Sequence, residues 1–201
     1  MTIRQERKED YAAVLRLTYA AFQTAPLVPP ERMRCDEHYL IHLMQTCEFL
    51  IPELCFVAER AGEIVGHILY TQSEILRPDG AKTSTITFGP LSVLPKVHKQ
   101  GIGRALVEYS LEKARELGYG AVLITGVPDY YPKIGFSRAR DFALTLENGA
   151  SPDYFMAFEL VPGTLRGGGV LHFLPPEFEL SERDDGAFEQ FHERFIAEYR
   201  L

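Results

Sequence analysis

The chain has 201 residues, of which 46% are hydrophobic and 24% charged, which is enough apolar material for one buried core. Its formal net charge of -7 argues against non-specific binding to nucleic acid and suits a cationic substrate such as an amine. The N-terminal residues lack the apolar segment of a signal peptide, and no apolar run approaches the length of a membrane span. With three scattered cysteines and no metal-ligand spacing, we expect a cytoplasmic protein with reduced thiols, no metal, and neither nucleic-acid nor membrane partners.

The first third of the chain alternates between apolar periods of two and of about three and a half residues, which predicts strands and helices in turn. Three prolines interrupt this pattern and exclude regular structure where they occur. The predicted elements are a strand over 2–5, a helix over 9–22, a proline-containing loop over 23–30, a helix over 36–48, and a hairpin of strands 54–59 and 64–71.

The middle of the chain reads as strand, glycine loop, helix and strand. A long strand is expected over 83–94, and the pair Gly89-Pro90 inside it indicates a bulge. A helix is expected from Ile102 to Leu117, and the wholly apolar run 121–125 indicates a strand buried on both faces. This order predicts two parallel strands joined through the helix.

The glycine loop before this helix has the make-up of an anion site. The first N–H groups of a helix have no partner within it, and the helix dipole is positive at that end. Gly101 and Gly103 would allow a phosphate group to approach the backbone, while Lys99 and Arg104 would add positive charge at the rim. The same residues could equally form a tight turn with a helix cap.

Two motifs flank the helix expected from Ile102. The second consists of Tyr131, Gly135 and Phe136, and the first consists of Val93, Pro95, His98, Gly101, Ile102, Gly103 and Leu106. They resemble motif B and motif A of the GCN5-related N-acetyltransferases, in which position 98 is usually Gln or Arg. The run from 54–59 through Gly135-Phe136 to 155–160 and 162–168 is similar to the YhbS-like branch of that family, and the resemblance covers roughly residues 2–175.

The resemblance implies a mixed α/β fold of the GNAT type, in which a central twisted and mostly antiparallel sheet contains one parallel β-α-β unit and is flanked by helices. That domain would span residues 1–160. A C-terminal extension over 161–201, with a strand near 170–173 and a helix over 184–199, is expected to pack on the same domain. In the family the first two helices and the loop between them wall the acceptor site.

The resemblance also implies direct transfer of an acetyl group from acetyl-CoA to a primary amine of a small molecule or a protein. The backbone N–H of Val93 would stabilise the oxyanion, and Tyr131 would act as the general acid, with Tyr130 as the alternative. The implied cofactor-binding residues are Leu91, Ser92, Val93, His98, Lys99, Gln100, Gly101, Ile102, Gly103, Arg104 and Tyr131.

Three questions stay open from the sequence. The general base is open: no carboxylate lies in 83–93, and the nearby carboxylates are Glu59, Glu63 and Glu74. A water relayed through His67, Thr87 or Ser92 is as plausible as any of these carboxylates. A non-catalytic acyl-CoA sensor on the same fold, or a transferase for longer acyl chains, would carry the same motifs. The acceptor is not indicated, and the aromatic C-terminal helix could pack on its own domain or on a partner in a homodimer.

Overall fold

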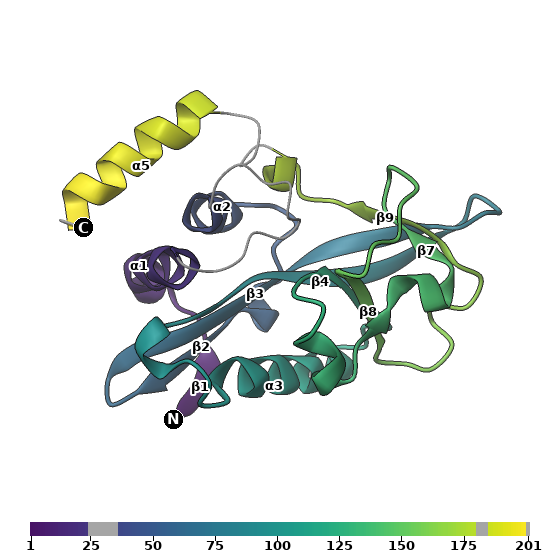
Figure 1. The fold of residues 1–201 in the computed structure, drawn as a ribbon, viewed down its shortest axis with the longest axis horizontal. Coiled ribbons are helices and arrows are strands. Elements are labelled where there is room, and N and C mark those ends of the chain that lie inside the picture. The colour runs from purple at the N-terminus through teal and green to yellow at the C-terminus, as the bar shows by residue number, and fades with distance from the viewer. Residues whose placement is uncertain (24–35, 180–184, 200–201) are drawn as a thin grey trace.

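The architecture is one twisted sheet with helices on both faces, as the computed structural model shows (Figure 1). The structure describes residues 1–23, 36–179 and 185–199. Most of the predicted proline-containing loop, the acceptor-wall loop up to residue 35, and Cys35 therefore lie outside the described residues. Within them, the predicted strands 2–5 and 121–125 are confirmed residue for residue.

The sheet follows the order β1-β2-β3-β4-β5-β8-β6, and β9 pairs with both β3 and the short β7. Neighbouring strands are antiparallel except β4 with β5 and β7 with β9, which confirms the predicted mostly antiparallel sheet and its β-α-β unit. The strands are β1 Thr2–Gln5, β2 Phe56–Arg60, β3 Glu63–Leu76, β4 Lys82–Val93, β5 Ala121–Thr125, β6 Ser137–Arg138, β7 Leu144–Thr145, β8 Phe155–Glu159 and β9 Gly169–Phe173.

Helices α1 and α2 cover one face of the sheet with α5 outside them, and α3 covers the other face (Figure 1). α2 covers Glu37–Met44 and is shorter than the predicted 36–48. After it, the N–H groups of Thr46 and Cys47 bond carbonyl oxygens three residues earlier, which is a turn and not a continued α-helix, and Leu50 then forms a β-bridge with Thr71 on β3. The helices are η1 Lys8–Asp10, α1 Tyr11–Phe22, α2 Glu37–Met44, η2 Pro52–Leu54, η3 Pro95–Val97, α3 Ile102–Glu116, η4 Tyr131–Ile134, η5 Ala139–Phe142 and α5 Asp185–Tyr199.

The strand alternation sends apolar side chains to both faces and so builds two main cores. Phe56, Ile68 and Tyr70 pack against α3, whereas Val57 and Leu69 pack against α1 and α2. Gly66 lets α3 lie close to β3, since a Cβ there would come within 2.9 Å of side-chain atoms of Ile102 and Leu106. The absent side chain of Gly66 therefore makes room for the side chains of α3 against the sheet.

The bulge predicted at Gly89-Pro90 is present, and it lies where β4 leaves β5. Two residues of β4 stand opposite Leu69 alone in the β3 register, and the Gly89-Pro90 peptide is cis. β4 and β5 form a single parallel pair, Ile86 with Val122. Beyond this pair β4 continues to Val93 beside β3 alone, so one of its edges carries no strand among the described residues.

The helix α5 is held to α2 and α1 by a cluster of aromatic and imidazole rings. His38 on α2 is 3% exposed, and its Nε2 lies 3.1 Å from Nδ1 of His192 on α5. The rings of Tyr19, Phe191 and Phe195 lie within 5.5 Å of the His38 ring. Burial lowers the pKa of His38 to about 4, so the ring is neutral in the folded chain.

We expect this buried imidazole to make the protein less stable as the pH falls below neutrality. The unfolded chain takes up a proton at an ordinary pKa near 6.5 while the folded chain resists it, so the stabilisation is complete above about pH 6.5 and is lost toward pH 4. His38 alone should remove about 2 kcal/mol of unfolding free energy between pH 7 and pH 5. Urea unfolding at the two pH values measures this loss.

The matched comparison is His38→Phe, which keeps a ring in the cluster and removes the titrating group. The variant should lose about 2 kcal/mol less than the parent over the same pH interval. Equal losses in the parent and in His38→Phe would contradict the assignment.

Candidate functional site

The loop that joins β4 to α3 is shaped by two left-handed residues. Lys99 has a φ of 61° and Gly101 a φ of 80°, and Gly101 is the N-cap from which α3 begins at Ile102. Glycine suits this position because a side chain at such a φ is strained. A turn with residues of this conformation directs successive N–H groups toward one concave surface, where an anion can bind.

The backbone N–H groups of residues 99–104 form no hydrogen bond within the described residues. The first bond into the helix runs from the N–H of Ala105 to the carbonyl oxygen of Gly101, over 2.9 Å. These six donors lie at the positive end of a helix of 15 residues, α3. A phosphate or diphosphate would satisfy several of them at once.

Side chains around the loop hold its shape and contribute charge. Nε2 of His98 donates to the carbonyl oxygen of Val93 over 2.8 Å and so ties the loop to the end of β4. Gln100 accepts a bond from Arg60 on β2, and Arg104 donates to Glu108 one turn along α3. Lys99 is exposed and forms no ion pair among the described residues, which leaves its ammonium group available to an anion.

The open edge of β4 presents the backbone groups of Leu91 and Val93. The N–H of Leu94 donates to the carbonyl oxygen of Val65, so residues 94 and 65 form a hydrogen-bonded pair in the antiparallel ladder. Such pairs alternate along the ladder, and Ser92 with His67 is the next one. The N–H groups of Leu91 and Val93 therefore point away from β3, into the gap where β5 has separated.

Ser92 differs from its two neighbours among the predicted site residues. Its side chain is fully buried, and its Oγ lies 3.0 Å from Oγ1 of Thr18 on α1. Its backbone faces β3, as the alternation requires. Ser92 thus connects β4 to α1 and presents no group to the gap, whereas the other predicted cofactor-binding residues lie on the loop, along the open edge or, for Tyr131, on η4.

Two adjacent tyrosines lie across the gap from β4. A Cβ on Gly103 would lie 2.8 Å from the hydroxyl oxygen of Tyr130 and 3.5 Å from Val93, so the glycine lets Tyr130 reach the start of α3. Tyr131, on η4, is 9% exposed and packs beside Phe88 next to the bulge. Gly126 makes room for it, since a Cβ there would lie 2.4 Å from the Tyr131 ring.

Both phenols are kept in the protonated form. Burial is the main cause that raises the pKa of Tyr130 and of Tyr131 above the ordinary value near 10. Neither hydroxyl forms a hydrogen bond within the part of the chain that the structure describes. Each can therefore act as a neutral donor toward a group that develops negative charge in the gap.

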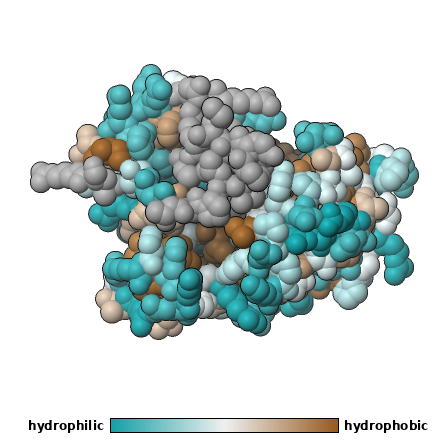
Figure 2. All heavy atoms as spheres, in the orientation of Figure 1, coloured by the Kyte–Doolittle hydropathy of each residue, from teal (hydrophilic) through white to brown (hydrophobic). Residues whose placement is uncertain are grey.

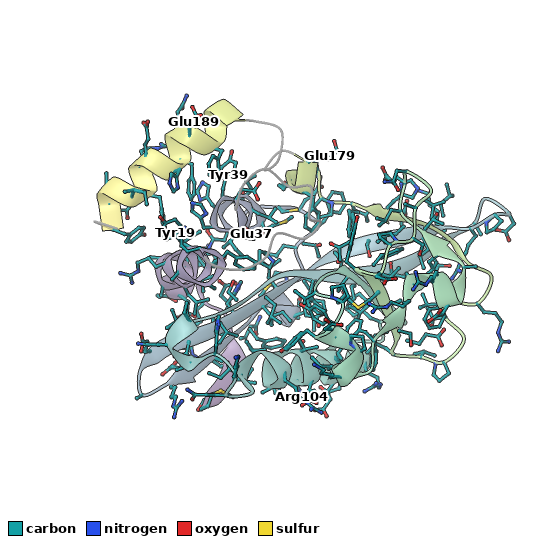
Figure 3. All side chains as sticks on the ribbon, viewed as in Figure 1. Tyr19, Glu37, Tyr39, Arg104, Glu179 and Glu189 are labelled. Carbon is teal, nitrogen blue, oxygen red and sulfur yellow. The ribbon has the colours of Figure 1, made fainter. Side chains whose placement is uncertain are left out.

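The space-filling view shows a hollow where these elements meet. In Figure 2 hydrophobic residues appear at the bottom of a depression near the middle of the visible face, which in Figure 1 lies between β4 and α3. Figure 3 places Arg104 on the α3 side of the sheet, opposite Tyr19 and Tyr39. A ligand could thus lie with its anionic part on the loop and an extended part along β4.

The residues suggested as a proton relay lie on the other face of the sheet. His67, Ser92 and Thr87 are each at most 3% exposed and point toward the α1 and α2 side. Nε2 of His67 lies 3.4 Å from Oε1 of Glu6, and neither ring nitrogen forms a hydrogen bond with another described residue. Among residues 1–23, 36–179 and 185–199, no group of three His, Cys, Asp or Glu side chains could hold a metal ion.

Two features of the site escaped sequence reasoning. The pairing of Ser92 with Thr18 joins residues 74 positions apart and has no local pattern. The sequence held one indirect sign that another residue lies close to Gly103. It has a glycine in the first turn of a helix, where alanine would favour the helix more.

No described helix has an apolar stretch long enough to cross a bilayer.

Comparison with known proteins agrees with this geometry. Residues 14–142 match the model of the acetyltransferase (GNAT) family. The uncharacterised N-acetyltransferase YhbS of Escherichia coli is 27% identical over 131 residues, which cover 65% of this chain and 76% of YhbS. YjhQ, a second uncharacterised N-acetyltransferase of Escherichia coli, is 33% identical over 85 residues, which cover 42% of this chain and 46% of YjhQ.

Two solved structures share the fold over most of their length. The structure of Escherichia coli YhbS in complex with CoA has a TM-score of 0.75 at 25% identity and covers 89% of this chain and 91% of YhbS. A GNAT acetyltransferase from Brucella melitensis in complex with acetyl-CoA has a TM-score of 0.63 at 26% identity, covering 86% and 94%. Since the family model spans well over half of the sequence, this chain belongs to the acetyltransferase (GNAT) family.

Proposed function

We propose that this protein transfers an acetyl group from acetyl-CoA directly to a primary amine of a small molecule or a protein. The observation that carries the proposal is the row of six unpaired backbone N–H groups at the start of α3, directly beside the open edge of β4. Two similar proteins were solved with CoA or acetyl-CoA, which supports the same co-substrate here. The free thiols Cys47 and Cys55 suit the cytoplasm as its location.

The loop and the strand edge would divide the binding of the co-substrate between them. The N–H groups of residues 99–104 would hold the diphosphate, with Lys99 adding charge at the rim. The backbone of Leu91 would bond an amide of the pantetheine arm, as an added strand bonds a sheet edge, and the N–H of Val93 would remain for the thioester oxygen. His98 contributes indirectly in this arrangement, because its ring already bonds the carbonyl oxygen of Val93.

The chemistry follows from the groups that face the gap. The amine nitrogen attacks the thioester carbonyl carbon, the carbon–sulfur bond breaks, and its electron pair stays on sulfur. The N–H of Val93 would stabilise the oxyanion, and the neutral phenol of Tyr131 would donate its proton or a hydrogen bond to the departing sulfur. The amine proton would leave to a water molecule in the gap. We assign no side chain as the base, because His67, Ser92 and Thr87 are each at most 3% exposed.

The first test measures release of free thiol from acetyl-CoA in the presence of a panel of primary amines. Thiol release that depends on an amine, with the acetylated amine found by mass spectrometry, is the expected result. Binding of CoA without any turnover across the panel would instead favour the non-catalytic sensor on the same fold. Parallel assays with longer acyl-CoA donors establish the acyl group that the enzyme prefers.

Gly101→Ala should weaken CoA binding at least tenfold, because the added methyl group would occupy space beside the unpaired N–H groups. Gly62→Ala is the matched control, since Gly62 also has a φ of 80° and no atom within 4 Å of an added Cβ, but it lies at the tip of a hairpin. Isothermal titration with CoA should give parental affinity for this control. Equal affinities of the two variants would remove the loop from the proposed site.

Tyr131→Phe should lower kcat at least tenfold with little change in KM for acetyl-CoA, because only the donor to the departing sulfur is removed. Tyr130→Phe serves as the control and should change kcat less than threefold. Steady-state assays across pH measure both effects. A loss of turnover in Tyr130→Phe together with normal turnover in Tyr131→Phe would transfer the acid role to Tyr130.

A further inference from the structure

The hairpin of β2 and β3 borders the loop that leads into α3. In Figure 1 the hairpin lies at the end of the sheet where β4 runs into this loop. Two side-chain bonds join the hairpin to the connection between β4 and α3. Lys96 donates to Glu63, and Arg60 donates to Gln100, each over 2.7 Å. An anion on the loop would therefore have Arg60, the last residue of β2, beside it.

The positive charge of Arg60 has no acidic partner among the described residues. Gln100 is a neutral amide, and its Oε1 accepts only one of the N–H donors of the guanidinium. The acidic residues nearest to Arg60 in the sequence, Glu59 and Glu63, each form an ion pair with a different cation. The exposed Arg60 thus keeps its remaining donors and its charge for an anion, in a chain whose net charge is -7.

Arg60 extends the positive surface of the site beyond the loop itself. Lys99 belongs to the loop, next to the N–H groups proposed for the diphosphate, and the charge of Arg104 is paired with Glu108 on α3. Arg60 comes from a different element and borders the loop through Gln100. Coenzyme A carries a further phosphate group, the 3′-phosphate of its ribose, one sugar ring away from the diphosphate. A guanidinium binds the oxygens of such a group with two parallel N–H donors.

We propose that Arg60 binds the 3′-phosphate of CoA and so selects CoA over analogues that lack this phosphate. The inference rests on the proposed function, because it requires the diphosphate on the loop of residues 99–104. Gln100 would hold the guanidinium beside the loop, and the donors not bonded to Gln100 would go to the phosphate oxygens. If the bond to Gln100 served only the shape of the loop, loss of Arg60 would weaken ligands with and without the 3′-phosphate equally.

The test compares CoA with dephospho-CoA, which lacks only the 3′-phosphate and keeps the diphosphate and the pantetheine arm. Isothermal titration of the full chain should show at least tenfold tighter binding of CoA, as expected for a charge-assisted contact. Arg60→Gln should weaken the binding of CoA at least tenfold and that of dephospho-CoA less than twofold. Lys113→Gln, which removes a positive charge paired with Glu116 far along α3, should leave both affinities unchanged.

Retained affinity for dephospho-CoA shows that Arg60→Gln is folded and that its loop is intact. Arg60→Lys, which keeps the charge and loses the paired donors, should fall between the parent and Arg60→Gln in its preference for CoA. Equal affinities of the parent for the two ligands, a parental preference in Arg60→Gln, or equal losses for both ligands would overturn the assignment and leave the loop as the diphosphate site. Binding of neither ligand to the parent would overturn the proposed function, and the role of Arg60 with it.

Discussion

The separation of β4 from β5 after a single pair of residues is the constraint on which the site depends. The backbone N–H and C=O groups of a strand inside a sheet form hydrogen bonds with both neighbouring strands. Past Ile86, the backbone groups of β4 pair only with β3. The bulge at Gly89-Pro90 lies just beyond this pair, and the backbone of Leu91 and Val93 then faces open space. Buried or half-buried backbone groups of this kind are stable only if a ligand or water bonds to them.

The loop after β4 likewise presents backbone N–H groups that have no partner among the described residues, here at the start of a helix. The left-handed turns at Lys99 and Gly101 direct six N–H groups outward, and the bond from His98 to Val93 fixes this loop against the strand. Recognition therefore depends mainly on main-chain groups in a fixed shape. The ring of His98 bonds the carbonyl oxygen of Val93 and leaves these main-chain donors in place.

The two faces of the sheet divide the polar groups between separate tasks. Toward α3 and η4, the unpaired donors are backbone amides and two protonated phenols. Toward α1 and α2, the carboxylate of Glu6, the imidazole of His67 and the amide of Gln45 each have a buried atom without a hydrogen bond among the described residues. The sheet between them is close-packed, which keeps the proposed transfer site apart from these groups.

The sequence by itself determined the strand, glycine loop and helix order, the bulge at Gly89-Pro90 and the parallel pairing of 121–125, because each follows from local conformational preference and apolar period. The family resemblance, and not a local pattern, placed Ser92 among the expected cofactor-binding residues. Only the tertiary structure decided that Ser92 turns to Thr18, that Tyr130 reaches Gly103, and that Glu6 lies behind His67. These contacts join residues far apart in the chain, and their partners depend on strand register and helix packing, which no local pattern encodes.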